Sequence, residues 1–138
     1  MNINDTQDEI IECFAMLPDW HSKYEYLLEM ESSLPAMDSA LKTDRSLVHG
    51  CNSKAWIIAE LRDNKVQFIA DGETAISRGI LALMIKILGD RTPGNILASE
   101  LYFIDRIGLK DNLSMTRAQG LEHLIEKMYV LAKNLSNP

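Results

Sequence analysis

The sequence has little cysteine and no long hydrophobic run. Two cysteines stand among 138 residues, too few for the disulfide framework of a small secreted protein. The most apolar stretch, residues 79–89, is interrupted by Lys86 and is far shorter than the ~20 residues that span a bilayer. Acidic Asp5 stands where a secretory or transit signal needs basic residues. These absences predict a cytoplasmic protein with reduced thiols.

Positive charge is also scarce. The chain has 14 lysines and arginines against 20 aspartates and glutamates, and its formal net charge is −6. This balance argues against a general surface for nucleic-acid phosphates. No repeat, low-complexity tract or long polar linker occurs. We therefore expect a single domain over residues 1–138, a length that typically buries about 68–70% of the unfolded surface.

Apolar residues at helical spacing predict helices at the start of the chain. Ile10, Cys13 and Phe14 share one face of a first helix, which Asp5 can cap. Pro18 breaks that helix and fits the first turn of a second one. Cys13 lies on the apolar side and is predicted to be a core residue.

Further helices are predicted in the second half of the chain. Residues 74–88 are apolar over more than half of a helix circumference, with Asp71 or Gly72 as the expected N-cap and Gly89 at the end. Short helices are expected after Thr92-Pro93 and over residues 101–107. The last helix is expected to begin near Ser114, with apolar residues in amphipathic register to Leu135.

The middle of the chain predicts a small antiparallel sheet. Residues 47–49 form a candidate short strand, residues 55–61 are rich in Trp and Ile, and residues 66–70 alternate in polarity. Asp63-Asn64 between the last two runs predicts a tight hairpin turn. Because so small a sheet needs a helical layer over one face, we predict an α+β fold with about three strands flanked by helices.

Cys51 has the most suggestive setting for chemistry. It lies in V-H-G-C-N-S, residues 48–53, between two predicted strands, where a loop can present a side chain. Gly50 leaves room for another backbone beside the sulfur. A reactive thiol here needs a positive group or hydrogen-bond donors to lower its pKa, and His49 on a strand would point to the opposite face. The residues alone leave a reactive thiol and a small buried hydrophobe both open.

Arg117 is at odds with its predicted position. It falls in the first turn of the last helix, where the helix dipole disfavours a cation. Such departures often mark functional sites, and the plain alternative is a surface ion pair with Asp111 or Glu122. His49 and His123 fit ordinary surface or hydrogen-bonded histidines.

Familiar catalytic and metal-binding patterns are missing. The sequence contains no CxxC, HExxH, GxGxxG or P-loop pattern. A hydrolase built on Cys51 would need an ordered base, which no spacing identifies. A metal site from Cys51, His49 and Asp71 lacks the recurring ligand spacing of zinc sites, so no metal is expected.

Several short motifs occur in the order and spacing of one family. They are Asp19-Trp20 with Lys23-Tyr24 and Leu27, Leu34-Pro35, V-x-G-C-x-S-x-x-W over residues 48–56, Ala70-Asp71, Arg78-Gly79, Thr92-Pro93, Gly108-Leu109, and L-S-x-x-R-x-x-G-L over residues 113–121. Through these motifs the chain resembles the SufE family over about residues 10–132. Members of that family accept sulfur from a cysteine desulfurase in iron–sulfur cluster assembly, on a fold shared with IscU.

The resemblance implies a sulfur-carrier function for Cys51, which matches the persulfide-forming cysteine of the family. Cys51 would take persulfide sulfur from a cysteine desulfurase of the SufS or CsdA type, stimulate that enzyme, and pass the sulfur to a scaffold complex of the SufBCD type. The protein would be no stand-alone enzyme and hold no cofactor, because PLP belongs to the desulfurase. A further family trait is that the thiol stays sheltered until the partner docks.

The resemblance also implies roles for three supporting residues. Arg117 matches the arginine of the family's Ser-x-x-Arg motif and is predicted to contact the desulfurase or steady the cysteine loop. Asp71 lies beside that loop in the family fold. Asp105 aligns with an acidic residue that faces the partner.

The chain departs from the family pattern at three places. Asn52 stands where Gln is usual, Gly72 where Ser is usual, and Met115-Thr116 where Pro-Ser is usual. Gly72 is expected to loosen the start of the central helix, and loss of the proline to weaken the last helix slightly. Because the thiol is kept, these departures bear on partner affinity rather than on the sulfur relay.

Two other functions compete with the sulfur carrier. An iron–sulfur scaffold of the IscU type shares the fold but needs about three cysteine ligands, and this chain has two. An interaction module with an inert thiol is the other, and it predicts that Cys51→Ser leaves desulfurase turnover unchanged.

Overall fold

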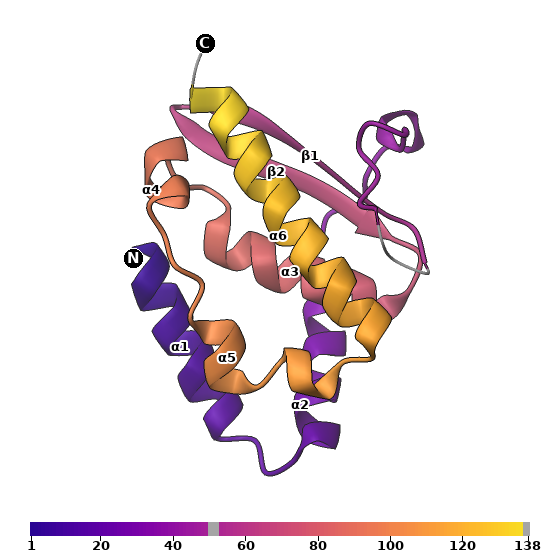
Figure 1. Cartoon of the computed structure of the whole chain (residues 1–138), viewed down its shortest axis with the longest axis vertical. Coiled ribbons are helices and arrows are strands. Elements are labelled where there is room, and N and C mark those ends of the chain that lie inside the picture. Colours follow the sequence, from indigo (N-terminus) through magenta and orange to yellow (C-terminus); the bar gives the residue numbers. More distant parts are fainter. Residues whose placement is uncertain (50–52, 137–138) are drawn as a thin grey trace.

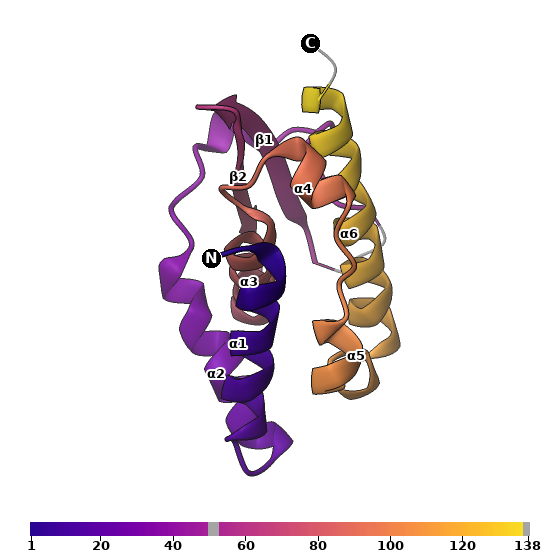
Figure 2. The same cartoon turned by 90° about the vertical axis from the view of Figure 1, so that its left-hand side faces the viewer.

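A two-stranded antiparallel hairpin carries helices against one of its faces (Figure 1 and Figure 2). The computed structural model describes residues 1–49 and 53–136. In chain order its elements are α1 (Ile3–Ala15), α2 (Trp20–Met30), the 3-10 turns η1 (Glu31–Ser33) and η2 (Ser39–Leu41), β1 (Ala55–Arg62), β2 (Lys65–Gly72), α3 (Ala75–Leu88), α4 (Pro93–Leu97), α5 (Phe103–Ile107), the 3-10 turn η3 (Lys110–Asn112) and α6 (Met115–Ser136).

Side-chain caps set the starts of α1 and α2, and both starts differ from the prediction. The Asn2 side chain accepts the Asp5 N–H at 2.7 Å, while the Asp5 carboxylate accepts the Asn2 N–H at 3.2 Å. Asn2 is therefore the cap and Asp5 the third residue of a capping box. For α2 the cap is Asp19, whose Oδ1 accepts the Ser22 N–H at 2.8 Å, and Pro18 precedes the helix rather than filling its first turn.

The central helix α3 has nearly the predicted bounds but a different cap. Thr74 Oγ1 accepts the Ser77 N–H at 3.2 Å, so Thr74 caps the helix, not Asp71 or Gly72. Those two residues still belong to β2, where their backbone is extended. Gly89 ends the helix as predicted.

The hairpin follows the sequence prediction closely. The two strands pair antiparallel over their whole length. Asp63 and Asn64 join them with φ of 52° and 65°, the left-handed values that a tight two-residue turn of this kind requires. Alternate residues of β2 are buried, from Val66 to Gly72, so one face of the hairpin supplies part of the core.

The prediction of about three strands is corrected to two among the described residues. The predicted strand at residues 47–49 is reduced to an isolated bridge that places Leu47 opposite Trp56. The Val48 N–H donates to the Ala55 carbonyl at 2.8 Å beside this bridge. The segment therefore lies along β1 without extending the sheet.

A buried serine closes the turn that precedes this segment. Its hydroxyl accepts the Thr43 N–H at 2.9 Å and donates to the Leu41 carbonyl at 2.7 Å. The Ser46 carbonyl accepts the Ile57 N–H at 2.8 Å. The Ser46 side chain thus holds the turn, and its carbonyl ties the turn to β1 directly before the bridge.

The core lies between the hairpin and the helices. In Figure 1, α6 crosses in front of the hairpin and α3. Helix α6 contacts β1, while α3 contacts both β2 and α2. Cys13 was predicted to be a core residue but is only half-buried. It stands at the edge of the apolar face of α1, on which Ile10 and Phe14 are fully buried. Within residues 1–49 and 53–136, no helix combines the length and apolarity that crossing a membrane requires.

Helices α2 and α3 come into backbone contact at Gly79. A Cβ added there would overlap the Leu27 carbonyl oxygen and lie 2.9 Å from the carbonyl carbon. Because backbone atoms of α2 occupy the space that a Cβ would need, only glycine fits at this crossing.

We predict that Gly79→Ala lowers the free energy of unfolding by about 3 kcal/mol, because a methyl group must push α2 away from α3. The matched control is Gly94→Ala in α4, where an added Cβ meets no atom within 4 Å. That control should change stability by no more than about 0.5 kcal/mol. Urea denaturation followed by circular dichroism measures both, and equal stabilities would contradict the close approach.

Candidate functional site

A cavity of about 480 Å³ opens where the first turns of α6 meet the end of the hairpin opposite its turn and the start of α3. Buried apolar side chains form its floor, and hydroxyl groups with one guanidinium form its rim. Among the described residues it is lined by Val48, Ser53, Ala55, Thr74, Ser77, Ile80, Leu81, Ser114, Thr116, Arg117, Gly120, Leu121 and Leu124.

The cavity brings Arg117 together with the two segments that flank the predicted thiol. Cys51 itself lies outside the described residues, as does Asn52. Val48 and Ser53, on either side of it in the sequence, both line the cavity with Arg117. The structure therefore joins the motif around residue 51 to the motif at the start of α6.

Three hydroxyl groups at the rim form a group that the sequence analysis missed. The Thr74 hydroxyl donates to Ser77 Oγ at 2.6 Å, and Ser53 Oγ lies 3.4 Å from Ser77 Oγ. They stand at the N-terminus of α3, where the helix dipole favours negative charge. A threonine directly before an apolar helical run is a capping signal that could have revealed Thr74. The arrangement can donate hydrogen bonds to an anion in the cavity.

Arg117 lies exposed at the rim in the first turn of α6. Its backbone N–H donates to Ser114 Oγ at 3.2 Å, so the cap of the helix is a neutral hydroxyl. Neither Asp111 nor Glu122, the two surface partners considered from the sequence, pairs with Arg117; Glu122 pairs instead with Lys110 at 2.9 Å. Within the part of the chain that the structure describes, no carboxylate pairs with Arg117. The unfavourable interaction of its positive charge with the helix dipole is therefore not offset by an ion pair among these residues.

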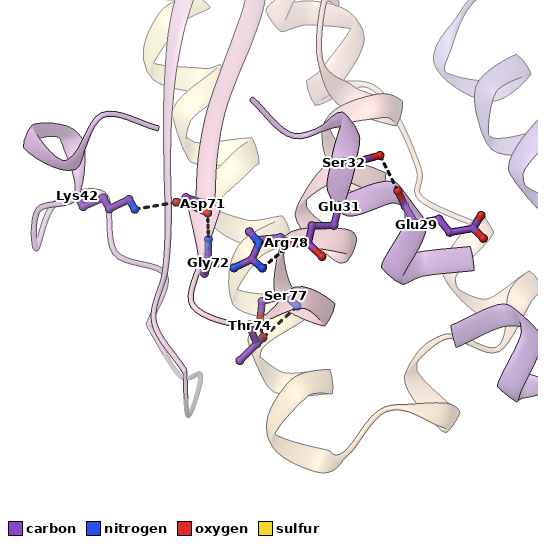
Figure 3. A network of polar contacts seen from close by, with 9 residues as sticks. All are labelled: Glu29, Glu31, Ser32, Lys42, Asp71, Gly72, Thr74, Ser77 and Arg78. Atoms are coloured by element: carbon purple, nitrogen blue, oxygen red, sulfur yellow. Dashed lines mark hydrogen bonds and ion pairs between the residues drawn. The ribbon is translucent and has the colours of Figure 1, made fainter. Parts of the chain in front are cut away.

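Asp71 lies on the face of the hairpin that points away from the core. Its carboxylate accepts the Lys42 ammonium at 2.7 Å and the Gly72 N–H at 2.8 Å (Figure 3). Burial alone would raise the pKa of Asp71, but these two donors outweigh it and hold the pKa below its ordinary value. Lys42 also lies 5.1 Å from the centre of the Trp56 ring. Asp71 thus fastens the segment around Lys42 to the outer face of the sheet.

Arg78 fastens the turn between β2 and α3, as Figure 3 shows. Its Nε donates to Glu31 Oε1 at 2.8 Å, and its Nη1 donates to the Gly72 carbonyl at 2.9 Å. In the sequence, nothing beyond the Arg78-Gly79 motif distinguishes this arginine. Through one half-buried guanidinium, the turn between β2 and α3 is held against the end of α2.

The residues after the predicted thiol are bound to the start of α3. The Lys54 N–H donates to Glu73 Oε1 at 2.6 Å, and the Glu73 N–H donates to the Lys54 carbonyl at 2.9 Å. These two hydrogen bonds place Lys54 opposite Glu73, the next pair after Ala55 and Gly72 in the register of the hairpin. It fixes one end of the segment that contains Cys51.

The residues before the predicted thiol are bound to α6. Lys127 Nζ donates to the Arg45 carbonyl at 2.7 Å and to the Leu47 carbonyl at 3.2 Å. Burial lowers the pKa of Lys127, and in the described ranges no carboxylate pairs with it. The ammonium therefore serves as a donor to two backbone carbonyls and anchors the other end of the segment.

Two predicted residues lie elsewhere. Asp105 is exposed on α5 and does not line the cavity. Cys13, the other cysteine of the chain, lies on α1 beside Tyr26. Burial raises the pKa of Tyr26, and the Cys13 thiol adds to the rise. Neither Asp105 nor Cys13 is brought to the cavity.

We predict that Lys127→Met loosens the segment at residues 45–48. The substitution keeps an apolar stem but removes both hydrogen bonds to carbonyls, which should cost about 1 kcal/mol of stability. Amide hydrogen exchange at Val48 and Ile57, whose N–H groups pair across this segment, should quicken more than exchange within the hairpin. Lys133→Met, exposed in the last turn of α6, is the control and should leave both amides unchanged. Unchanged exchange at Val48 in Lys127→Met would show that the anchor is unimportant.

Comparison with known proteins gives consistent matches along nearly the whole chain. Residues 8–132 match the family model of SufE, described as an Fe-S metabolism associated domain. The chain is 32% identical over 132 residues to the sulfur acceptor protein CsdE of Escherichia coli (strain K12), covering 94% of this chain and 90% of that protein. It is 30% identical over 126 residues to an uncharacterized SufE-like protein of Rhizobium meliloti (strain 1021), with 88% and 90% covered.

A solved structure has the same fold. The solution structure of a hypothetical protein from Thermus thermophilus superimposes with a TM-score of 0.80 at 18% identity, covering 96% of this chain and 97% of that one. The predicted α+β fold with a small antiparallel sheet is thereby confirmed, with the strand count corrected above. On the family model and the 32% identity to CsdE, the chain belongs to the SufE family.

Proposed function

We propose that this protein is a sulfur acceptor that takes persulfide sulfur onto Cys51 from a cysteine desulfurase. The observation that carries the proposal is the SufE family match over residues 8–132, within which V-x-G-C-x-S-x-x-W contains Cys51. The relative named as a sulfur acceptor, CsdE, is similar over 94% of this chain. The cavity beside Val48 and Ser53 supports the same assignment.

The proposed transfer is an exchange between sulfur atoms. The Cys51 thiolate attacks the outer sulfur of the persulfide on the desulfurase, and a new S–S bond forms to Cys51. The S–S bond of the donor breaks, and its electron pair leaves with the donor's cysteine thiolate. Cys51 then carries the persulfide, with no external oxidant or reductant required. A second exchange of the same kind hands the sulfur to an iron–sulfur scaffold complex of the SufBCD type.

The groups around the cavity suit such a thiolate. Hydroxyl donors such as Ser53 and Ser77, together with the start of α3, favour negative charge on sulfur. We assign the PLP chemistry to the desulfurase, so this chain needs no cofactor, acts as an activator rather than a stand-alone enzyme, and works in the cytoplasm.

The supporting residues receive distinct roles in this proposal. Arg117 contacts the desulfurase or steadies the cysteine loop from the rim of the cavity. Asp71 acts through Lys42, fastening the segment that leads to the thiol. Asp105, exposed on α5, is assigned to the partner-facing surface.

We predict that the wild-type protein gains the mass of one sulfur atom when mixed with a cysteine desulfurase, PLP and cysteine. Peptide mass spectrometry should map the sulfur to Cys51, and Cys51→Ser should abolish it because serine cannot form a persulfide. Cys13→Ser is the matched control and should keep the added sulfur. No added sulfur on wild type with several desulfurases would overturn the proposal, and a coloured cluster after reconstitution would favour the IscU-type scaffold instead.

We predict further that Arg117→Ala lowers stimulation of the desulfurase about tenfold, because a guanidinium that contacts the partner or the thiol loop is lost. The fold should persist, since Arg117 is exposed and makes no ion pair with the described residues. Arg62→Ala, also exposed and at the hairpin turn, should stimulate as wild type does. Desulfurase turnover with each variant is the measurement, and equal stimulation by both would remove Arg117 from the site.

A further inference from the structure

Glu73 makes a hydrogen bond that sets it apart from the other carboxylates in the part of the chain that the structure describes. Its Oε1 accepts the backbone N–H of Lys54, 19 positions away in the sequence, at 2.6 Å. The other backbone N–H groups that bind these carboxylates lie within three residues of the acceptor. Among the described residues, Glu73 is therefore the one carboxylate that joins two separate segments through a backbone N–H group.

The Glu73 carboxylate takes the place of a backbone carbonyl in the strand pairing. Ala55 lies opposite Gly72, so Lys54 and Glu73 form the next pair of the hairpin. The Glu73 N–H donates to the Lys54 carbonyl at 2.9 Å, as in a regular antiparallel ladder. A regular ladder would return the Lys54 N–H to the Glu73 carbonyl, but β2 ends at Gly72 and this N–H binds the carboxylate instead. The side chain thus adds one pair at the end of the hairpin that leads to the predicted thiol.

The backbone of Glu73 is itself held on both sides. Before it, the Gly72 carbonyl accepts Arg78 Nη1 at 2.9 Å. After it, Thr74 caps α3 by accepting the Ser77 N–H at 3.2 Å, a bond drawn in Figure 3. A carboxylate on so fixed a backbone is a preorganised acceptor, because little conformational freedom is left to lose when it binds.

Lys54 is the third residue after Cys51 in the sequence, and the residue before it is held at the same place. Ser53 Oγ lies 3.4 Å from Ser77 Oγ, in the first turn of α3. Two successive residues are therefore bound near the start of α3, one through its side chain and one through its backbone. Of the groups that make these bonds, the Glu73 carboxylate carries the charge, and charge-assisted hydrogen bonds are about twice as strong as neutral ones.

We propose that Glu73 is a positioning residue for sulfur transfer, which orients the segment that contains Cys51 by holding the backbone of Lys54. This inference rests on the proposed function and adds to it a residue that acts through the backbone of another. Transfer rates depend steeply on the placement of the reacting atoms, and an error of about 1 Å can cost about a hundredfold. Loss of this tether is therefore expected to slow the transfer step rather than to weaken the encounter of carrier and desulfurase.

The test separates the hydrogen bond of Glu73 from its charge. Glu73→Ala removes both, whereas Glu73→Gln keeps an oxygen acceptor and removes only the charge. The control is Glu126→Ala, which removes an exposed carboxylate of α6 that makes no hydrogen bond or ion pair within the described residues. Circular dichroism checks that all variants fold.

Two measurements report the tether and the transfer separately. Amide hydrogen exchange at Lys54 reports the tether itself. Single-turnover transfer of sulfur to Cys51, followed by mass spectrometry at several carrier concentrations, gives the maximal rate and the half-saturating concentration.

In Glu73→Ala, exchange of the Lys54 amide should quicken about tenfold or more and the maximal transfer rate should fall about tenfold. The half-saturating concentration should change by less than about threefold, because the encounter is untouched. Glu73→Gln should stay within about threefold of the wild-type rate, since its amide oxygen still accepts the N–H. Glu126→Ala should match the wild type in both measurements.

Three results would overturn the positioning role. The first is a wild-type rate in Glu73→Ala. The second is an equal loss of rate in Glu73→Ala and Glu73→Gln, which would assign the effect to charge. The third is a raised half-saturating concentration at an unchanged maximal rate, which would make Glu73 a partner contact. If wild-type Cys51 gains sulfur, any of these results refutes the role of Glu73 alone, whereas no sulfur on the wild type refutes the proposed function and this inference with it.

Discussion

The close crossing of α3 over α2 is the constraint on which the rest of the structure depends. Gly79 abuts the Leu27 carbonyl, so the two helices lie at backbone contact. One residue earlier, Arg78 binds Glu31 at the end of α2 and the Gly72 carbonyl at the end of the sheet. Sheet, α2 and α3 are thereby fixed to one another before any loop is considered. Because α3 supplies both floor and hydroxyl groups to the cavity, this crossing also sets the shape of the site.

Basic residues fill two different roles around that site. The half-buried lysines bind groups of this same chain. Lys42 binds Asp71 on the outer face of the sheet, and Lys127 binds backbone carbonyls of the segment before the predicted thiol. Arg117, exposed at the rim of the cavity, pairs with no carboxylate among the described residues. The half-buried lysines thus hold the segments on either side of the predicted thiol in place, while Arg117 stays exposed beside them.

Two departures from the family pattern have other consequences in the folded chain than the sequence predicts. Gly72 was expected to loosen the start of α3, yet a Cβ there would lie 3.1 Å from the Ser77 Cβ, so glycine fits a tight place beside the capped helix. Met115 is 79% exposed at the first position of α6, next to the rim residue Arg117. Lacking the usual proline, α6 still begins there because Ser114 caps it.

Local sequence pattern was enough to predict most helices, the hairpin and the motif around the thiol. The helical period, the strand alternation and the Asp63-Asn64 turn all depend on neighbours in the chain. Local pattern failed where several local choices compete: the predicted caps of α1 and α3 were wrong, α2 begins after Pro18 rather than at it, and the strand predicted at residues 47–49 is a single bridge. It could not reveal that Lys127 binds the Arg45 carbonyl 82 residues away, or that Arg117 shares a cavity with Ser53. Such contacts arise only when α6 packs across β1, because burial of apolar faces, not sequence proximity, brings these polar groups together.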